Sequence, residues 1–120
     1  MDIYTDGSGW NGRKCEYAVV FEDGRVIREL FQTKCTNNEM EYAALIRALK
    51  ECSAGDIIHT DSQLLIGHVT KGWKVNKDHL RPLVDESKKL VAEKKVKLVW
   101  VPREKNKAGI LIEGSDHRLS

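Results

Sequence analysis

The sequence lacks a hydrophobic run long enough to cross a membrane or to direct secretion. It also lacks paired cysteines, because Cys15, Cys35 and Cys52 are isolated and form no Cys-x-x-Cys motif. This spacing indicates neither a disulfide framework nor a zinc site, so we expect reduced and largely buried thiols. We therefore predict a soluble, cytoplasmic protein with no membrane association.

A strong excess of one charge is absent as well, since 20 Lys and Arg oppose 18 Asp and Glu for a net charge of +2. The chain has no overall basic field of the kind that attracts nucleic acids, so any such binding must be local. The best local patch surrounds Trp73 and consists of Lys71, Lys74, Lys77 and Arg81. The lysines between 88 and 97 fit a solvated helix face instead.

With 120 residues and a composition that is 41% hydrophobic, the chain can bury a core without metal or disulfides, and we predict one domain over residues 1–120. Strands are predicted over 3–5, 15–21, 26–32, 57–60 and 96–101, and helices over 38–51, 62–68 and about 80–91. A short element over 107–113 precedes a polar tail. Asp23-Gly24 predicts a tight hairpin, so the first three strands form an antiparallel meander. The order predicts an α/β fold with a mixed five-stranded sheet flanked by helices.

Three acids stand out against this plan. Asp6 and Asp61 follow predicted strands, and the carboxyl ends of parallel neighbours meet at one sheet edge. Glu41 lies on the apolar helix stripe that continues through Leu45 and Ala48, so it does not belong to a solvated face. Carboxylate oxygens gathered in this way are the ligands that Mg²⁺ prefers.

Each acid also has a structural alternative. Asp6 before Gly7 could be an ordinary turn aspartate, and Asp61 before Ser62 could be the N-cap of the following helix. Glu41 could reach back to an N-cap at Asn38. Thr36 with Glu39 fits the Ser/Thr-x-x-Glu capping box better, and this would leave Glu41 without a capping role.

Four motifs in order resemble those of type 1 ribonuclease H: Asp6-Gly7-Ser8, Thr-Asn-Asn-Glu-Met-Glu over 36–41, Thr60-Asp61-Ser62-Gln63, and Trp-Val-Pro-Arg-Glu over 100–104 with Asn106. Each motif alone is weak, but the ordered set is specific and covers nearly the whole chain. The resemblance implies a ribonuclease H-like fold in a compact form, because the segment 71–75 leaves no room for a basic protruding helix.

The resemblance also implies an activity, the hydrolysis of the RNA strand of RNA/DNA hybrids to 5′-phosphate and 3′-hydroxyl ends. Asp6, Glu41 and Asp61 would hold two Mg²⁺ or Mn²⁺ ions, so no protein nucleophile is required. Gly7, Ser8, Asn37, Asn38 and Gln63 would read the RNA 2′-hydroxyl groups across the minor groove.

The DNA strand would be recognised separately. Thr36 and Asn76 match the family's phosphate pocket, and Trp73 matches its channel aromatic. Asn76 could instead cap the long helix, and Trp73 could belong to the core. With few Lys and Arg contacts, we expect weak and salt-sensitive binding of the hybrid.

The chain departs from the family pattern at its fourth acid, because Gly109 stands where an aspartate is expected. Asn106 is the predicted replacement ligand, although its oxygen could serve as an N-cap instead. Glu113, one helical turn beyond Gly109, is a less favoured ligand. A neutral fourth ligand predicts activity that favours Mn²⁺ or raised Mg²⁺.

Two other functions stay open at this stage. One is a catalytically weakened module that binds RNA/DNA hybrids, and the other is a DNA-cutting relative of the same fold, which the Asp-Gly-Ser and Thr-Asn-Asn context disfavours. Three retained acids favour the enzyme, since like charges close together need a cation. We expect a free-standing monomer with no obligate protein partner.

Overall fold

The computed structural model describes residues 1–119, with side chains up to Gly114. Five strands form one sheet: β1 (Asp2–Ser8), β2 (Cys15–Phe21), β3 (Val26–Phe31), β4 (Ile57–Thr60) and β5 (Lys97–Trp100). Their order is β3-β2-β1-β4-β5, with antiparallel β1–β2 and β2–β3 pairs and with β4 parallel to both of its neighbours. The predicted mixed sheet and its antiparallel meander are confirmed.

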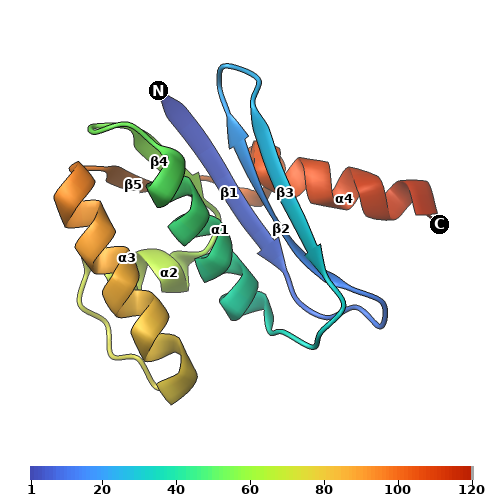
Figure 1. The fold of residues 1–120 in the computed structure, drawn as a ribbon, viewed down its shortest axis with the longest axis horizontal. Coiled ribbons are helices and arrows are strands. Elements are labelled where there is room, and N and C mark those ends of the chain that lie inside the picture. The colour runs from blue at the N-terminus through green and yellow to red at the C-terminus, as the bar shows by residue number, and fades with distance from the viewer. Residues whose placement is uncertain (120) are drawn as a thin grey trace.

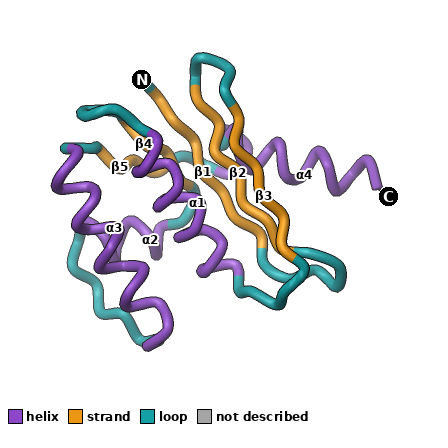
Figure 2. The backbone as a smooth tube through the Cα atoms, viewed as in Figure 1, coloured by secondary structure: helices purple, strands orange, loops and turns teal. Residues whose placement is uncertain are grey.

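Four α-helices cover the sheet: α1 (Asn37–Glu51), α2 (Gln63–Thr70), α3 (Arg81–Lys94) and α4 (Lys107–Leu119). Helix α1 packs on β1 and β2 with α2 and α3 beside it, while α4 crosses the other face of the same two strands (Figure 1). The tube view shows the same separation, with α4 apart from the other three helices (Figure 2). No helix within residues 1–119 is long and apolar enough to cross a membrane.

Alternation along the strands creates two cores. Ile3 and Val19 point to the face that packs against α1, where they join a large buried cluster. Tyr4 and Val20, one residue further along, pack with Ala108 and Ile112 of α4 on the opposite face. The period of two along each strand therefore decides which residues meet α1 and which meet α4.

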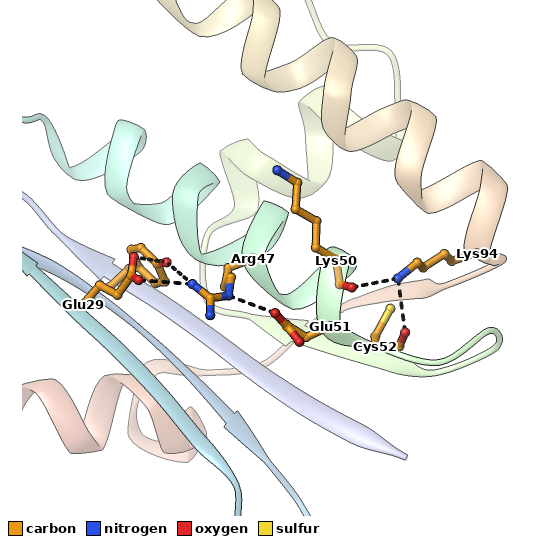
Figure 3. A network of polar contacts seen from close by, with 7 residues as sticks. Glu29, Arg47, Lys50, Glu51, Cys52 and Lys94 are labelled. Atoms are coloured by element: carbon orange, nitrogen blue, oxygen red, sulfur yellow. Dashed lines mark hydrogen bonds and ion pairs between the residues drawn. The ribbon is translucent and has the colours of Figure 1, made fainter.

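Polar contacts fasten α1 to its neighbours (Figure 3). Arg47 forms ion pairs with Glu29 on β3 at 3.1 Å and with Glu51 one turn later at 3.2 Å. At the other end, Lys94 Nζ donates to the carbonyl oxygens of Lys50 and Cys52, at 3.1 and 3.2 Å. A cation at the carboxyl end of α1 satisfies carbonyls that have no helical partner.

The larger differences from the sequence prediction involve three segments. Strand β1 continues to Ser8, so Asp6 lies within the ladder opposite Ala18 and is not a turn aspartate. A short 3₁₀ helix, η1 (Asp78–Leu80), precedes α3. Helix α4 extends to Leu119 where a tail was predicted from residue 114, because no strong breaker interrupts it.

Candidate active site

Asp6 and Asp61 lie at the same edge of the sheet. Strands β1 and β4 are parallel, with Ile3 opposite Ile58, and Asp61 follows the last residue of β4 directly. Parallel neighbours end at one edge, which is where open α/β sheets form their sites. The predicted meeting of these two acids is therefore explained by the strand order.

Gly7 brings the third acid to this edge. A Cβ atom on Gly7 would lie 2.2 Å from the backbone carbon of Met40 and 2.4 Å from the backbone nitrogen of Glu41. Only glycine permits such a close crossing of β1 and α1. The crossing sets Glu41 beside the end of β1.

The helix caps that Glu41 and Asp61 could have formed are formed by other residues. Thr36 caps α1 in a full capping box with Glu39, as predicted. Ser62 caps α2 by accepting a hydrogen bond from the Leu65 amide at 3.1 Å. Neither Glu41 nor Asp61 caps a helix, so both carboxylates are available to the site.

The three acids line a single polar pocket of about 160 Å³. The remaining lining residues are Gly7, Ser8, Asn37, Arg103, Ile112 and Glu113. The pocket thus joins the ends of β1 and β4, the start of α1, the 3₁₀ helix η2 (Arg103–Lys105) and the first turns of α4.

Burial and mutual repulsion change the protonation of these acids. Burial, followed by the charges of Asp61 and Glu41, raises the pKa of Asp6 to about 7. Burial and the charge of Asp61 likewise raise the pKa of Glu41 to about 7, although a hydrogen bond from Ser62 opposes the shift. The buried Oε2 atom of Glu41 has no hydrogen-bond partner among the described residues. Buried carboxylates without compensation create a demand for positive charge.

The donor set fits a divalent cation. Asp6, Glu41 and Asp61 offer hard anionic oxygens on the walls of one pocket, and one of these oxygens is buried and unpartnered. Among the described side chains, no three His, Cys, Asp or Glu groups are already gathered closely enough to hold an ion. The carboxylates would have to approach one another to share an ion.

Asn106 does not line the pocket, and its hydrogen bonds favour the N-cap alternative over the predicted role as a ligand. Its Oδ1 accepts a hydrogen bond from the Ala108 amide at 3.1 Å, and its Nδ2 donates to the Thr5 carbonyl at 3.0 Å. The same Nδ2 donates to Asp61 Oδ2 at 3.1 Å. Turning the amide over would place its oxygen against the Thr5 carbonyl, so these partners fix its orientation. Asn106 therefore caps α4 and positions Asp61.

Gly109 lies in close contact with the first acid of the site. A Cβ atom built on Gly109 would lie 3.3 Å from Asp6 Oδ2. A side chain at this position would thus begin beside the first acid. Glycine itself offers no oxygen from a side chain to this part of the site.

Arg103 and Glu113 are also part of the site. Both line the pocket, and Arg103 Nε donates to Glu113 Oε1 at 2.7 Å. The sequence marked Arg103 only as a member of the Val-Pro-Arg-Glu motif, and no spacing rule linked it to Glu113 ten residues later.

The residues predicted to bind RNA occupy two places. Ser8 and Asn37 line the acid pocket, and Asn37 Oδ1 accepts a hydrogen bond from the Gly9 amide at 2.6 Å. Asn38, half-buried, follows on the first turn of α1. Gln63 lines a separate pocket of about 300 Å³ with Trp73, Trp100, Ile66 and Lys71.

The residues predicted to bind DNA are on the surface. Trp73 is 45% exposed and so does not belong to the core, and its ring lies against Gly67 of α2, where a Cβ atom would come within 2.0 Å of it. Asn76 is exposed and caps no helix, because η1 begins after Lys77 and α3 after Leu80. Thr36 is exposed at its cap.

Comparisons with known proteins agree with this geometry. The sequence model of the RNase H family matches residues 1–109. A ribonuclease H of Novosphingobium aromaticivorans is 32% identical in an alignment 121 residues long. The alignment covers 84% of this chain and 82% of that protein.

Solved structures are similar over almost the whole chain. RNase H1 from the halophilic archaeon Halobacterium salinarum NRC-1 is 25% identical with a TM-score of 0.73, and the match covers 97% of both chains. LC11-RNase H1, solved in complex with an RNA/DNA hybrid, is 30% identical with a TM-score of 0.76 and 99% coverage of both chains. With the fold, the three acids and these relatives in agreement, the chain belongs to the RNase H family of ribonucleases.

Proposed function

We propose that this protein is an endonuclease that hydrolyses the RNA strand of RNA/DNA hybrids with the help of two divalent cations. The observation that carries the proposal is the group of Asp6, Glu41 and Asp61 in one pocket, where burial and like charges raise the pKa of Asp6 and of Glu41 to about 7. A protein has little reason to keep such a costly group unless a cation relieves it.

The chain's own residues prepare the site for the cations. Asp6, Glu41 and Asp61 supply the anionic oxygens, and Asn106 holds the Asp61 carboxylate in place through its Nδ2 atom at 3.1 Å. When bound, two ions would activate a water molecule and stabilise the leaving 3′ oxygen, giving 5′-phosphate and 3′-hydroxyl ends. No Ser or Cys nucleophile takes part.

Recognition of the RNA strand is assigned to small polar groups next to the acids. Gly7, Ser8 and Asn37 surround the pocket, and Asn38 and Gln63 extend this surface along α1 and α2. Such groups suit the 2′-hydroxyls of a wide, shallow minor groove. The LC11-RNase H1 structure with its RNA/DNA hybrid supports the choice of substrate.

The DNA strand is assigned to the surface around Trp73. This ring has Lys71 Nζ 5.9 Å from its centroid and shares a pocket with Trp100. Thr36 and Asn76 would contact DNA phosphates. Because few basic residues take part, we expect binding that weakens steeply as salt increases.

A time course with a hybrid labelled on either strand tests the proposal. With Mn²⁺, the RNA strand is expected to shorten to products with 5′-phosphate and 3′-hydroxyl ends, while the DNA strand, single-stranded RNA and double-stranded DNA stay intact. Asp61→Asn serves as the control and is expected to be inactive. Failure of the wild type to cleave, or equal cleavage by Asp61→Asn, would refute the nuclease assignment.

The missing carboxylate at Gly109 favours a second candidate, a catalytically weakened module that binds hybrids. A gel-shift assay on the same samples separates the two functions. Retention of the hybrid without cleavage in Mn²⁺ or in raised Mg²⁺ would favour the binding module, whereas cleavage with a preference for Mn²⁺ would favour the enzyme.

A further inference from the structure

Gly109 carries no side chain to bind a cation, but a carboxylate one helical turn away lines the pocket. Glu113 lies one helical turn further along α4 and lines the same pocket as Asp6, Glu41 and Asp61. A glutamate side chain is one methylene longer than an aspartate side chain, which extends its reach back along the helix towards Gly109.

No other described side chain of this helix offers a ligand oxygen to the pocket. Asn106 lies at the entrance of α4, but its oxygen accepts the Ala108 amide and its amino group faces Thr5 and Asp61. Ile112 is the other α4 residue that lines the pocket, and its side chain is apolar. Glu113 is thus the one carboxylate that the described part of α4 brings to this wall.

Glu113 is held by Arg103. The Nε atom of Arg103 donates to Glu113 Oε1 at 2.7 Å, and the side chains are 77% and 48% exposed respectively. Exposed ion pairs are weak in water, because solvent screens the charges and ordering long side chains costs entropy. This carboxylate can therefore exchange its partner at low cost.

The positive charge of Arg103 also acts on the acids of the site. It lowers the pKa of Asp6 and of Glu41, although burial outweighs this effect for both groups. Arg103 lines the same pocket as Glu113 and the acids, so a cation entering the pocket would compete with its guanidinium group.

Resting on the function proposed above, we propose that Glu113 is the fourth carboxylate ligand of this site. We further propose that Arg103 binds the Glu113 carboxylate while no cation is present. In the absence of divalent cations, Glu113 pairs with Arg103. When a cation occupies the pocket, the Glu113 carboxylate leaves the guanidinium and completes the ligand shell that Gly109 leaves open. Metal affinity is then set by a competition between Arg103 and the cation for one carboxylate.

A purely structural role for the pair is the main rival. In that case Arg103 and Glu113 only fasten η2 to α4, and the loss of either side chain would change stability without changing metal affinity beyond a general charge effect. A double-mutant comparison separates the two roles, because only the proposed exchange couples Arg103 to metal binding through Glu113.

The experiment measures Mn²⁺-induced thermal stabilisation without nucleic acid. We compare the wild type with Glu113→Gln, Arg103→Gln and the double variant, and use Glu104→Gln as a control that removes the same charge from a neighbouring residue that does not line the pocket. Unfolding in chelator establishes that each variant folds.

Glu113→Gln is expected to raise the Mn²⁺ concentration needed for half of the stabilisation by at least about tenfold. Arg103→Gln is expected to lower it when Glu113 is present and to lose most of that gain in the double variant. Glu104→Gln is expected to match the wild type, and Gly109→Asp is expected to rescue Glu113→Gln.

An unchanged midpoint in Glu113→Gln would overturn the proposal. An equal gain from Arg103→Gln with and without Glu113 would also overturn it, since Arg103 would then act by charge alone. The parent function fails separately: it is refuted if the wild type does not cleave a hybrid in Mn²⁺, whatever the effect of Glu113→Gln on the Mn²⁺ midpoint. If Asp61→Asn loses both properties while Glu113→Gln keeps both, only the role of Glu113 falls.

Discussion

Asp6 and Glu16 lie on the same face of the sheet, two positions apart along the β1–β2 ladder. Their surroundings nevertheless shift their pKa values in opposite directions. Glu16 is 1% exposed and is held by Lys14 at 3.1 Å and by Arg28 at 2.7 Å. Burial alone would raise its pKa, but hydrogen bonds and charge from Arg28 and Lys14 lower it. For Asp6, burial and two neighbouring acids raise the pKa to about 7.

This contrast distinguishes a structural acid from one reserved for a ligand. The fold supplies Glu16 with two cations, so its charge is stable in the protein alone. Asp6 and Glu41 instead have Asp61 as a neighbouring acid, and the charge of Arg103 lowers their pKa values only slightly. Removing the two kinds of acid should therefore have opposite effects on stability and on activity.

The largest expected effect is on catalysis. Asp6→Asn is expected to reduce hybrid cleavage in Mn²⁺ by about 10³-fold or more, because a cation contributes several kcal/mol to the transition state. In chelator at pH 8, the same variant is expected to melt at a higher temperature than the wild type, since it removes a buried repelling charge. Cleavage assays and thermal melts of one preparation check both halves. A lower melting temperature together with full activity would contradict the comparison.

Glu16→Gln should show the reverse pattern. It breaks a buried ion pair and is expected to lower the free energy of unfolding by about 2–4 kcal/mol, while activity per folded molecule in Mn²⁺ is retained. Denaturant unfolding measures the first quantity. Glu51→Gln, which breaks the exposed pair with Arg47 on α1, is a matched control with an expected loss of less than about 1 kcal/mol.

A smaller effect is expected from pH in the absence of divalent cations. Because the pKa values of Asp6 and Glu41 are raised to about 7 in the folded state, these groups keep protons that the unfolded chain releases near pH 4. Their contribution to stability is therefore lost as pH rises from about 4 through about 7, by about 1–3 kcal/mol, and stops changing only above about pH 8.

Denaturant unfolding at several pH values in chelator measures this slope. The difference between the wild type and a variant carrying both Asp6→Asn and Glu41→Gln isolates the two acids from the other titrating groups. Saturating Mn²⁺ is expected to restore stability above pH 7. A difference that does not vary with pH would show that the two acids do not repel as described.

The smallest expected effect is a gain. Gly109→Asp places a carboxylate next to Asp6. The new Cβ atom would lie 3.3 Å from Asp6 Oδ2, so Asp6 must shift slightly to accept it. We expect cleavage at low Mg²⁺ to increase about tenfold, which corresponds to about 1.4 kcal/mol. Gly114→Asp adds the same charge to α4, where a new Cβ atom would meet nothing within 4 Å, and is expected to have no effect.

Much of the fold could be predicted because its signals are local. Asp23-Gly24 predicted the hairpin between β2 and β3, and Gly24 indeed adopts a φ of +98° with its amide bonded to the Phe21 carbonyl. Thr36 and Glu39 predicted the start of α1 through their capping box. The extent of α4 was missed, because polar composition from Gly114 onward was taken as a tail although nothing there strongly breaks a helix.

The site was less predictable where one residue had two possible partners. Asn106 could be a ligand or a cap by sequence alone, and the choice depended on Thr5 and Asp61, which are 101 and 45 residues away. Asp61 had a similar ambiguity, which Ser62 resolved by taking the cap. In both cases the sequence allowed one side-chain oxygen either to cap a nearby helix or to bind a cation together with residues from distant segments.

By itself, the sequence determined the strand and helix order, the three acids and the glycine at position 109, because these follow from periodicity, turn chemistry and residue identity. Only the tertiary structure decided that Asn106 turns its oxygen away, that Glu113 and Arg103 share the pocket with Asp6, and that Glu16 is neutralised where Asp6 is not. Those outcomes depend on distances between segments far apart in the chain, and charge and hydrogen bonding act through distance.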